Sequence, residues 1–118
     1  MGTFNRPIRL DSMDGKRSLR LDALVDTGSF YTIVPASMLT RLEVARTDEA
    51  WLELADGRQV PYDMGEARAT VDGRSTATWV VFGEDGVRPL LGAYTLEGLR
   101  LSVDPVEETL VPIPYVRA

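Results

Sequence analysis

The residues of this 118-residue chain best suited to chemistry are Asp26-Thr27-Gly28, which follow the apolar pair Leu24-Val25 and precede Ser29. An aspartate in this setting can present its carboxylate from a tight turn. Two carboxylates that share one proton can activate a water molecule for amide hydrolysis. The tripeptide occurs once in the sequence. A second carboxylate would therefore have to come from another copy of the chain, as in a symmetric homodimer.

A strand that simply ends in a polar turn would contain the same residues, so the rest of the chain has to support the chemical interpretation. The sequence has no His and no Cys, which excludes Ser-His-Asp hydrolysis, thiol nucleophiles, disulfides and metal sites built from these residues. Its one lysine, Lys16, lies in a predicted turn, where a desolvated lysine base is not expected. Carboxylates remain as the main acid–base groups, and we expect neither a cofactor nor a metal.

The composition is that of a soluble globular protein, with 44% hydrophobic and 26% charged residues. This length is sufficient for about one domain, which we place at residues 1–118. A net charge of -5 offers no basic surface for nucleic acid or an anionic membrane. No apolar run approaches the roughly 20 residues needed to span a bilayer, and the polar first residues do not resemble a signal peptide. We therefore expect a cytoplasmic protein.

Turn-forming dipeptides predict a fold rich in β-strands. Asp-Gly between apolar runs is a strong hairpin signal, and it occurs at Asp14-Gly15, Asp56-Gly57, Asp72-Gly73 and Asp85-Gly86. Before Asp26, apolar and polar residues alternate, which predicts a half-buried strand over residues 17–25. That strand would deliver the aspartate to its end.

The segment after Asp26 predicts a strand, a helix and a hairpin. We expect the strand at 31–34 and a short helix at 35–42 that has proline in its first turn. Two further strands, 51–54 and 59–62, flank the small polar tip Ala55-Asp56-Gly57-Arg58.

The strand after this hairpin carries Gly65, which indicates a bulge. Its return strand, expected at 76–82 after the turn at Asp72-Gly73, carries Trp79. A tryptophan in this position is expected in the core.

The last third of the chain predicts one more helix between short strands. The apolar element Leu90-Leu91-Gly92 precedes a helix expected at 93–98 and capped by Gly98, and a strand is expected at 99–104. The apolar tail at 109–116 contains prolines, which confine it to an edge strand or an extended segment.

Three of these elements, in this order, resemble the retropepsin-like aspartic peptidases. These are the single-domain relatives of pepsin found in retroviruses and, as cellular homologues, in bacteria and archaea, and the chain is similar to the bacterial or archaeal type. The elements are Leu24-Val25-Asp26-Thr27-Gly28-Ser29, the hairpin around Ala55 to Gln59, and Leu90-Leu91-Gly92 with its short helix. The resemblance implies an all-β fold, a closed barrel or sandwich of antiparallel strands with a flap hairpin and one or two short helices.

The resemblance also implies a role for each residue of the turn. Asp26 from each of two chains would lie close together on a two-fold axis, share a proton and hold the attacking water. Thr27 would hydrogen-bond to the partner chain's turn, and Gly28 would let the backbone turn tightly. Ser29 would hydrogen-bond to the carboxylate and orient it. Turn capping is a second explanation for Thr27 and Ser29.

The tip Ala55-Asp56-Gly57-Arg58 matches the family's flap, which closes over an extended peptide and excludes water. The peptide would add as a β-strand between the flap and the floor of the site. Unlike the viral flaps, this tip is not a run of glycines and carries both an acidic and a basic residue. After Gly92, where viral enzymes usually have Arg, the chain has Ala93, so the structural salt bridge expected there is absent.

The sequence thus predicts an aspartic endopeptidase that acts as a homodimer on extended peptide or protein substrates. Phe4 to Leu10 and Leu110 to Val116 are candidates for the contact between subunits, with core packing as an equal alternative. A catalytically quiet module for dimerisation or peptide binding is the alternative function, and the intact Asp-Thr-Gly-Ser favours the enzyme. A barrel that binds oligosaccharide or RNA is disfavoured, because basic surface and stacking aromatics are missing.

Overall fold

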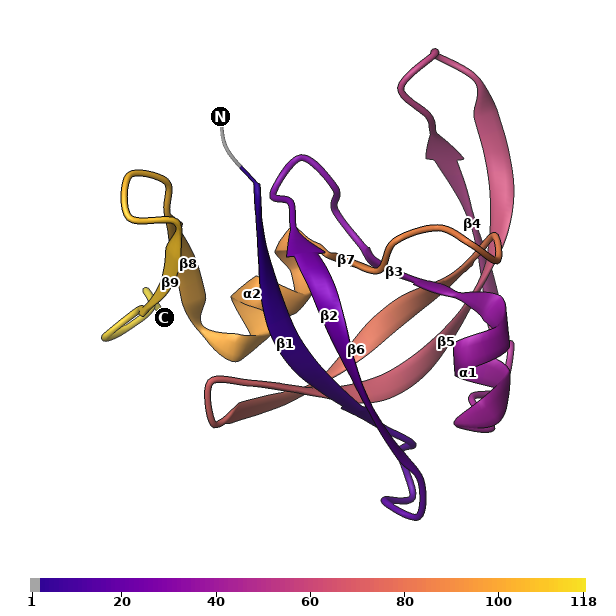
Figure 1. Ribbon diagram of the computed structural model, residues 1–118, viewed down its shortest axis with the longest axis horizontal. Helices are drawn as coiled ribbons and strands as arrows, with labels where there is room; N and C mark the ends of the chain where they lie inside the picture. The colour runs from indigo at the N-terminus through magenta and orange to yellow at the C-terminus, as the bar shows by residue number, and fades with distance from the viewer. Residues whose placement is uncertain (1–2) are drawn as a thin grey trace.

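The computed structural model describes residues 3–118, whose strands and helices are arranged as Figure 1 shows. The strands are β1 (Phe4–Asp11), β2 (Ser18–Val25), β3 (Thr32–Pro35), β4 (Asp48–Glu53), β5 (Gln59–Val71), β6 (Arg74–Gly83), β7 (Leu90–Leu91), β8 (Leu101–Asp104) and β9 (Thr109–Pro112). The helices are α1 (Ala36–Arg41) and α2 (Ala93–Leu99). These bounds confirm the predicted strand before Asp26, the strand and helix after it, and the hairpin that follows.

Seven strands form one sheet in the order β1-β2-β7-β3-β6-β5-β4. A further pairing between β1 and β5 joins this sheet back on itself, so it closes into a barrel, and β4 pairs with the part of β5 that extends beyond it. The predicted all-β barrel is confirmed, and the β4–β5 hairpin rises clear of it (Figure 1). Strands β8 and β9 form a separate two-stranded sheet.

Two strand pairs in the barrel are parallel, which the pattern of turns does not predict. Strand β2 pairs with β7, and β3 pairs with β6, in the parallel sense. Asp85-Gly86 lies in the connection between β6 and β7, which run in opposite directions. Those two strands are not neighbours in the sheet formed by residues 3–118. The other three Asp-Gly dipeptides form hairpin turns as predicted, whereas the hairpin expected at Asp85-Gly86 is wrong.

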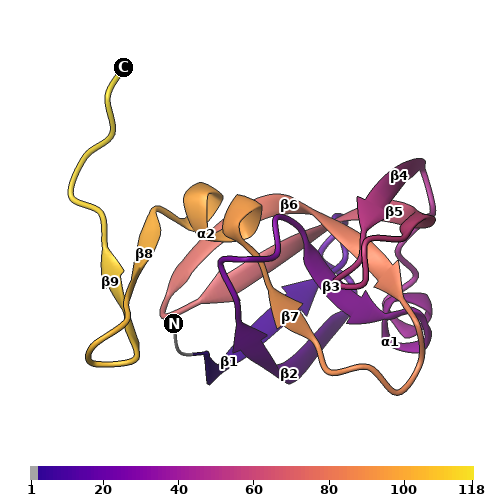
Figure 2. The same cartoon turned by 90° about the horizontal axis from the view of Figure 1, so that it is seen from above.

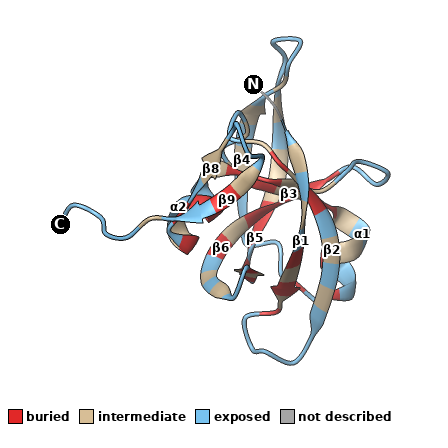
Figure 3. Cartoon of the chain, turned by 60° about the vertical axis from the view of Figure 1, so that its left-hand side comes forward, coloured by how far each residue is buried: buried red, intermediate tan, exposed pale blue. Residues whose placement is uncertain are grey.

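The inward faces of the barrel strands and of both helices make up the hydrophobic core (Figure 3). Strand β6 contributes Thr78, Val80 and Phe82, all buried. Successive side chains of a strand point to opposite faces, so Trp79 lies on the other face of β6 and is only half-buried. The prediction that Trp79 belongs to the core is therefore wrong.

Gly65 marks a close approach of two chain segments and not the predicted bulge. It pairs with Val80 in an uninterrupted β5–β6 register. A Cβ atom at this position would collide with the backbone oxygen of Ala45 and lie 2.7 Å from Val44 Cγ1. Glycine is needed here because the loop after α1 packs directly against the strand.

The C-terminal end of α2 also differs from the prediction. Gly98 lies inside the helix, where a Cβ would be 2.8 Å from Thr76 Oγ1, and the helix is capped by Arg100 in the left-handed conformation (φ 56). The Arg74 guanidinium donates hydrogen bonds to the carbonyl oxygens of Leu99 (3.3 Å) and Arg100 (2.9 Å). These bonds satisfy carbonyl groups that a helix end leaves without partners.

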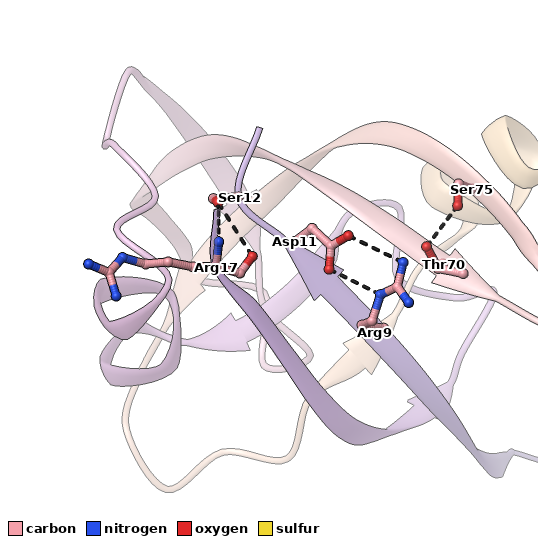
Figure 4. Close-up of polar contacts among 6 residues, drawn as sticks. All are labelled: Arg9, Asp11, Ser12, Arg17, Thr70 and Ser75. Carbon is pink, nitrogen blue, oxygen red and sulfur yellow. Dashed lines mark hydrogen bonds and ion pairs between the residues drawn. The ribbon is translucent and has the colours of Figure 1, made fainter. Parts of the chain in front are cut away.

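Polar contacts close to the ends of the long hairpins hold the turns of the barrel (Figure 4). The Arg17 backbone N–H donates to Ser12 Oγ at 3.0 Å. Across the β5–β6 turn, the hydroxyl groups of Thr70 and Ser75 are 2.7 Å apart. No helix within residues 3–118 is long and apolar enough to cross a membrane.

Candidate active site

Asp26 lies directly after the last residue of β2 and is half-buried. Its backbone N–H donates to the carbonyl oxygen of Leu91 in β7 at 3.1 Å, which continues the parallel β2–β7 pairing by one step. The chain then turns, and the Ser29 N–H donates to the Asp26 carbonyl oxygen at 3.1 Å. The strand–turn junction predicted from the sequence is thus confirmed, and β7 fixes its position.

The turn itself holds the Asp26 carboxylate. The Gly28 N–H donates to Asp26 Oδ1 at 2.9 Å. A Cβ at Gly28 would lie 3.1 Å from the same oxygen, which is tighter than an ordinary contact. A side chain at this position would press on the carboxylate, and glycine avoids this contact.

The side chains of Thr27 and Ser29 lie in different surroundings. Thr27 is exposed at the turn. The Ser29 hydroxyl donates to the carbonyl oxygen of Tyr31 at 2.9 Å. A hydroxyl has one proton to donate, so the predicted hydrogen bond from Ser29 to the Asp26 carboxylate is not the one that this single chain forms. Ser29 instead stabilises the turn.

The first residues of α2 hydrogen-bond to the backbone of the turn that follows Asp26. The Ala93 N–H donates to the Ser29 carbonyl oxygen at 2.9 Å, and the Tyr94 N–H donates to the Phe30 carbonyl oxygen at 2.8 Å. At Gly92, a Cβ would lie 2.5 Å from both the carbonyl carbon and oxygen of Tyr31. The backbone of residues 92–94 thus packs directly on the backbone of the turn, which only a glycine at position 92 permits.

A buried chain of hydroxyl groups links this contact to the barrel. Thr32 Oγ1 accepts a hydrogen bond from the Gly92 N–H at 3.1 Å and is 2.6 Å from Thr95 Oγ1. Thr95 Oγ1 is in turn 2.8 Å from Thr78 Oγ1. All three threonines are buried. Buried polar groups are costly unless they are paired, so this network specifies how β3, β6 and α2 fit together beneath the turn.

Aromatic rings gather where the Asp26 turn meets α2. The rings of Phe30, Tyr31 and Tyr94 contact one another, with centroids 4.9 to 6.0 Å apart. Phe30 is 56% exposed and Tyr94 is 37% exposed. The sequence predicts that the salt bridge of the viral enzymes is missing at Ala93. Here the aromatic contacts and the two backbone hydrogen bonds from Ala93 and Tyr94 hold the Asp26 turn on α2.

The β4–β5 hairpin carries the tip predicted as a flap. The Leu54 N–H donates to the Arg58 carbonyl oxygen at 2.8 Å, and the Gly57 N–H donates to the Leu54 carbonyl oxygen at 2.9 Å. Gly57 has φ +88, a conformation that favours glycine. The tip is therefore a tight hydrogen-bonded turn, and Ala55 is exposed within it.

One acidic and one basic side chain brace this tip. Asp56 accepts hydrogen bonds from the Arg58 backbone N–H at 3.0 Å and from Arg58 Nε at 2.7 Å. These two bonds hold the pKa of the Asp56 carboxyl below its ordinary value, and the backbone bond has the larger effect. Both side chains are well exposed, so water screens the ion pair.

A groove of about 410 Å³ separates the Asp26 turn from the β4–β5 hairpin. Its lining comes from both sides, with Gly28, Ser29, Phe30, Tyr31 and Ile33 on the barrel side and Trp51, Leu52, Glu53 and Leu54 on the hairpin. A second hollow of about 280 Å³ shares the apolar residues Ile33, Leu52 and Leu54 with the first. It adds the charged residues Arg58, Glu84 and Arg88.

The predicted site residues are only partly brought together. Gly28 and Ser29 line the groove, and Arg58 lines the second hollow. The residues that line neither are Asp26, Thr27, Ala55, Asp56 and Gly57. The hairpin contacts the groove through its strand β4 and not through its tip. The apolar lining residues were not predicted as part of the site. The alternation of Leu52 and Leu54 with Glu53 was a signal for two of them.

The described residues contain no cluster of three or more His, Cys, Asp or Glu side chains that could hold a metal ion. This face offers a carboxylate that accepts a hydrogen bond from the Gly28 N–H, beside a mostly apolar groove. Such an arrangement can position a water molecule against an extended chain.

The closed barrel, the projecting hairpin and the turn packed on α2 define a retropepsin-like fold. Among solved structures, 85 chains match. One of them is the solution structure of the simian foamy virus (mac) protease, which is 18% identical, with a TM-score of 0.53, over 78% of this chain and 92% of that chain. At this identity, the similarity concerns the fold. No protein-family model and no curated protein matches the sequence.

Proposed function

We propose that the chain is an aspartic endopeptidase that acts as a homodimer, with one Asp26 from each chain. The observation that supports this most is the setting of Asp26. Its half-buried carboxylate accepts a hydrogen bond from the Gly28 N–H at 2.9 Å and lies next to residues that line a groove under the hairpin. The retropepsin-like fold points in the same direction. The bacterial or archaeal type and the cytoplasmic location stay predictions from the sequence.

The proposed chemistry uses two carboxylates that share one proton. The two carboxylates would lie close together on the two-fold axis, and a shared proton would relieve the repulsion between like charges. The ionised Asp26 takes a proton from the water, whose oxygen attacks the peptide carbonyl carbon, while the protonated Asp26 gives its proton to the carbonyl oxygen. The protonated Asp26 then gives its proton to the amide nitrogen, while the ionised Asp26 takes a proton from a hydroxyl group of the tetrahedral intermediate. The C–N bond breaks, an acid and an amine leave, and one proton again remains on the pair. Activity is expected to be highest at mildly acidic pH.

Substrate would bind as an extended strand in the groove. Backbone groups of the turn and of β4 would hydrogen-bond to the main chain of the peptide, and the apolar lining would receive its side chains. Leu52 and Leu54 contribute to both hollows, so neighbouring substrate side chains would contact the same hairpin strand. Thr27 would meet the partner chain's turn on the two-fold axis. Ala55, Asp56, Gly57 and Arg58 would cover the bound peptide.

Cleavage of an unfolded polypeptide over a range of acidic to neutral pH tests the proposal. We expect Asp26→Asn to lower the rate by at least about 100-fold, because it removes a proton-transferring group. Asp22→Asn is the matched control, since it makes the same chemical change at an exposed position of β2. The size of the wild-type protein in solution is measured in parallel.

A wild-type protein that is dimeric but never cleaves faster than Asp26→Asn would refute the endopeptidase and leave the quiet dimerisation or peptide-binding module. A chain that stays monomeric at high concentration would also contradict the proposal, because one Asp26 cannot form the pair.

A further inference from the structure

The second hollow, of about 280 Å³, shares part of its lining with the groove but differs from it in charge. Among residues 3–118, one charged residue, Glu53, lines the groove, whereas Arg58, Glu84 and Arg88 line the second hollow. The other walls of this hollow are mainly apolar and come from Ile33, Leu52, Leu54, Val81, Val87 and Leu90. Apolar walls with a few polar groups are typical of a site that selects one kind of ligand.

The loop that joins β6 to β7 carries Arg88 and is tied to the barrel on both sides of this residue. Before Arg88, the carboxylate of Asp85 accepts a hydrogen bond from the Ser37 N–H of α1 at 3.0 Å. After it, the Pro89 carbonyl oxygen accepts a hydrogen bond from the Leu24 N–H of β2 at 2.8 Å. Figure 2 shows the loop passing α1 before it enters β7. The backbone of Arg88 is therefore held at the edge of the second hollow.

Gly83, at the end of β6, lets two walls of the second hollow meet. A Cβ atom at Gly83 would lie 2.8 Å from Ile33 Cγ2 and 3.3 Å from Val87 Cγ2. Both side chains belong to the lining, so they pack over the glycine backbone, where a larger residue would push them apart. The second hollow is thus built by contacts between β3, the end of β6 and the loop that follows β6.

The three charged residues of the second hollow differ in whether they already have a partner. Arg58 Nε donates to Asp56 Oδ2 at 2.7 Å. Glu84 Oε1 accepts a hydrogen bond from the Tyr62 hydroxyl at 3.4 Å. The side chain of Arg88 forms no hydrogen bond or ion pair with any residue from 3 to 118. Because a guanidinium keeps its proton in proteins, Arg88 offers a permanent positive charge and several free N–H donors.

We infer that Arg88 makes the second hollow select an acidic side chain of the substrate, glutamate above all. The inference rests on the proposed function and names the substrate class that the same site prefers. The methylene groups of a glutamate would lie against Leu52 and Leu54, and its carboxylate would bind the guanidinium, which can hold a carboxylate through two N–H groups. Aspartate has one methylene group less to bury. Lysine would bring a second positive charge next to Arg88.

The charges around the two hollows support the same assignment. A substrate carboxylate in the groove would face the carboxylate of Glu53, whereas in the second hollow it would meet Arg88. Glu84 leaves Arg88 available, since within residues 3–118 the two side chains form no ion pair. In the proposed homodimer the second hollow occurs twice, once on each side of the two-fold axis. Acidic residues are therefore expected on both sides of the cleaved bond.

Cleavage of a mixture of peptides of random sequence measures this preference directly. The cleaved bonds are identified by mass spectrometry at about pH 6, where glutamate is ionised. For the wild type, we expect glutamate to be enriched at a fixed distance from the cleaved bond, and Arg88→Gln should lose this enrichment. Arg20→Gln is the matched control and should keep it, because Arg20 is an exposed arginine of β2 that lines neither the groove nor the second hollow.

Reversing the charge at position 88 should reverse the preference. Synthetic peptides would carry Glu, Gln or Lys at the enriched position and be otherwise identical. For the wild type, we expect kcat/KM to be about fivefold higher for the Glu than for the Gln peptide, since water screens an exposed ion pair. Most of this difference should lie in KM, because substrate and transition state use the contact equally. Arg88→Glu should prefer the Lys peptide, and circular dichroism checks that its fold is intact.

Peptide binding to the Asp26→Asn protein gives a measurement that does not need cleavage. One fluorescein-labelled, unstructured peptide without charged residues is prepared with Glu at each position in turn, and each dissociation constant is measured by fluorescence anisotropy. We expect the tightest Glu peptide to lose several-fold in affinity when Arg88→Gln is added, and to lose none when Arg20→Gln is added. High salt should reduce the same difference, because it screens the ion pair.

The results separate this inference from the proposed function. Cleavage without enrichment of glutamate, or an enrichment that persists in Arg88→Gln, would overturn the role of Arg88 and leave the endopeptidase standing. A preference for Glu peptides that Arg88→Gln removes, in a protein whose wild type does not cleave, would uphold the role of Arg88 and refute the endopeptidase. A protein that neither cleaves nor binds any of the peptides would overturn both.

Discussion

The two sides of the groove are held by different means. On the barrel side, the Asp26 turn rests on Gly92 and α2, and a buried row of threonine hydroxyls lies beneath it. On the other side, the β4–β5 hairpin projects into solvent, and its tip is held by its own turn and by the Asp56–Arg58 pair. The Asp26 turn is thus fixed by residues distant in the sequence, whereas the hairpin tip is fixed by its sequence neighbours.

This difference suits a site that must hold a carboxylate still while admitting a long substrate. Groups fixed by packing keep a reactive atom in place, whereas an element with few buried contacts opens at low free energy. Substitutions in the contacts beneath the Asp26 turn should therefore cost more stability than substitutions in local turns. Equal losses would show that the local turns are fixed as firmly as the Asp26 turn.

The largest expected difference is between two glycines, one on each side of the groove. In Gly92→Ala, the new Cβ would lie 2.5 Å from backbone atoms of Tyr31, and we expect a loss of about 3 kcal/mol in the free energy of unfolding. In Gly57→Ala, nothing lies within 4 Å of the Cβ, and only the positive φ is unfavourable, which costs about 1 kcal/mol.

Urea unfolding and cleavage of an unfolded polypeptide measure both variants. Gly92→Ala should also lower cleavage at least tenfold, because the displaced backbone carries the Asp26 turn. If Gly57→Ala destabilised the protein as much as Gly92→Ala, the hairpin tip would contribute as much to stability as the contact beneath the Asp26 turn. That result would contradict the difference between the two sides of the groove.

The second prediction concerns the buried hydroxyl row. Thr95→Val keeps the side-chain shape but removes the hydroxyl that lies between Thr32 and Thr78. Leaving buried polar groups unpaired costs about 1–3 kcal/mol. Thr70→Val removes a hydrogen bond to Ser75 at the β5–β6 turn, and we expect less than about 0.5 kcal/mol because water replaces the lost partner. Equal losses of thermal stability in the two variants would contradict the role of burial.

The part of this arrangement that is local in sequence was predictable. Alternation in residues 17–25 predicted β2 and the position of Asp26 at its end, and the Asp-Gly dipeptide predicted the turn at Gly57. Both features depend on neighbouring residues only, since a strand pattern and a turn are each set by adjacent side chains. Thr27 and Gly28 were identifiable as site candidates for the same reason, because they belong to the same short motif as Asp26.

The contacts that support the turn were not predictable in this way. Thr32 and Thr95 are 63 residues apart in sequence, and nothing in either segment indicates that they meet. The sequence predicts a bulge at Gly65 and a helix cap at Gly98, but close approaches to distant segments explain both glycines. The residue type of Trp79 predicts a core position, whereas the core of the barrel takes Val80 and Phe82 from the opposite face of β6. Tertiary packing decided each of these positions.

Trp51 is expected to contribute to substrate binding and not to stability. Trp51 lines the groove from β4 and is 67% exposed. Trp51→Ala should leave the free energy of unfolding within about 0.5 kcal/mol of the wild type. It should raise KM for peptide cleavage several-fold with little change in kcat, because it removes apolar contact area that substrate and transition state use equally. A fall in kcat at unchanged KM would show that the hairpin acts on the reacting groups instead.

The smallest expected effect is the response of the hairpin tip to acid. Hydrogen bonds from Arg58 hold the pKa of Asp56 below its ordinary value of 3.8. Because the pKa is lower in the folded than in the unfolded protein, this contact stabilises the tip at pH above 3.8 and is lost as pH falls through the lowered pKa. The tip should therefore stay intact through the mildly acidic range in which the Asp26 pair is expected to act. An NMR titration of the Arg58 backbone amide should show a midpoint below 3.8 that disappears in Asp56→Asn, and a midpoint at or above that value would mean that the tip loosens where catalysis is expected to begin.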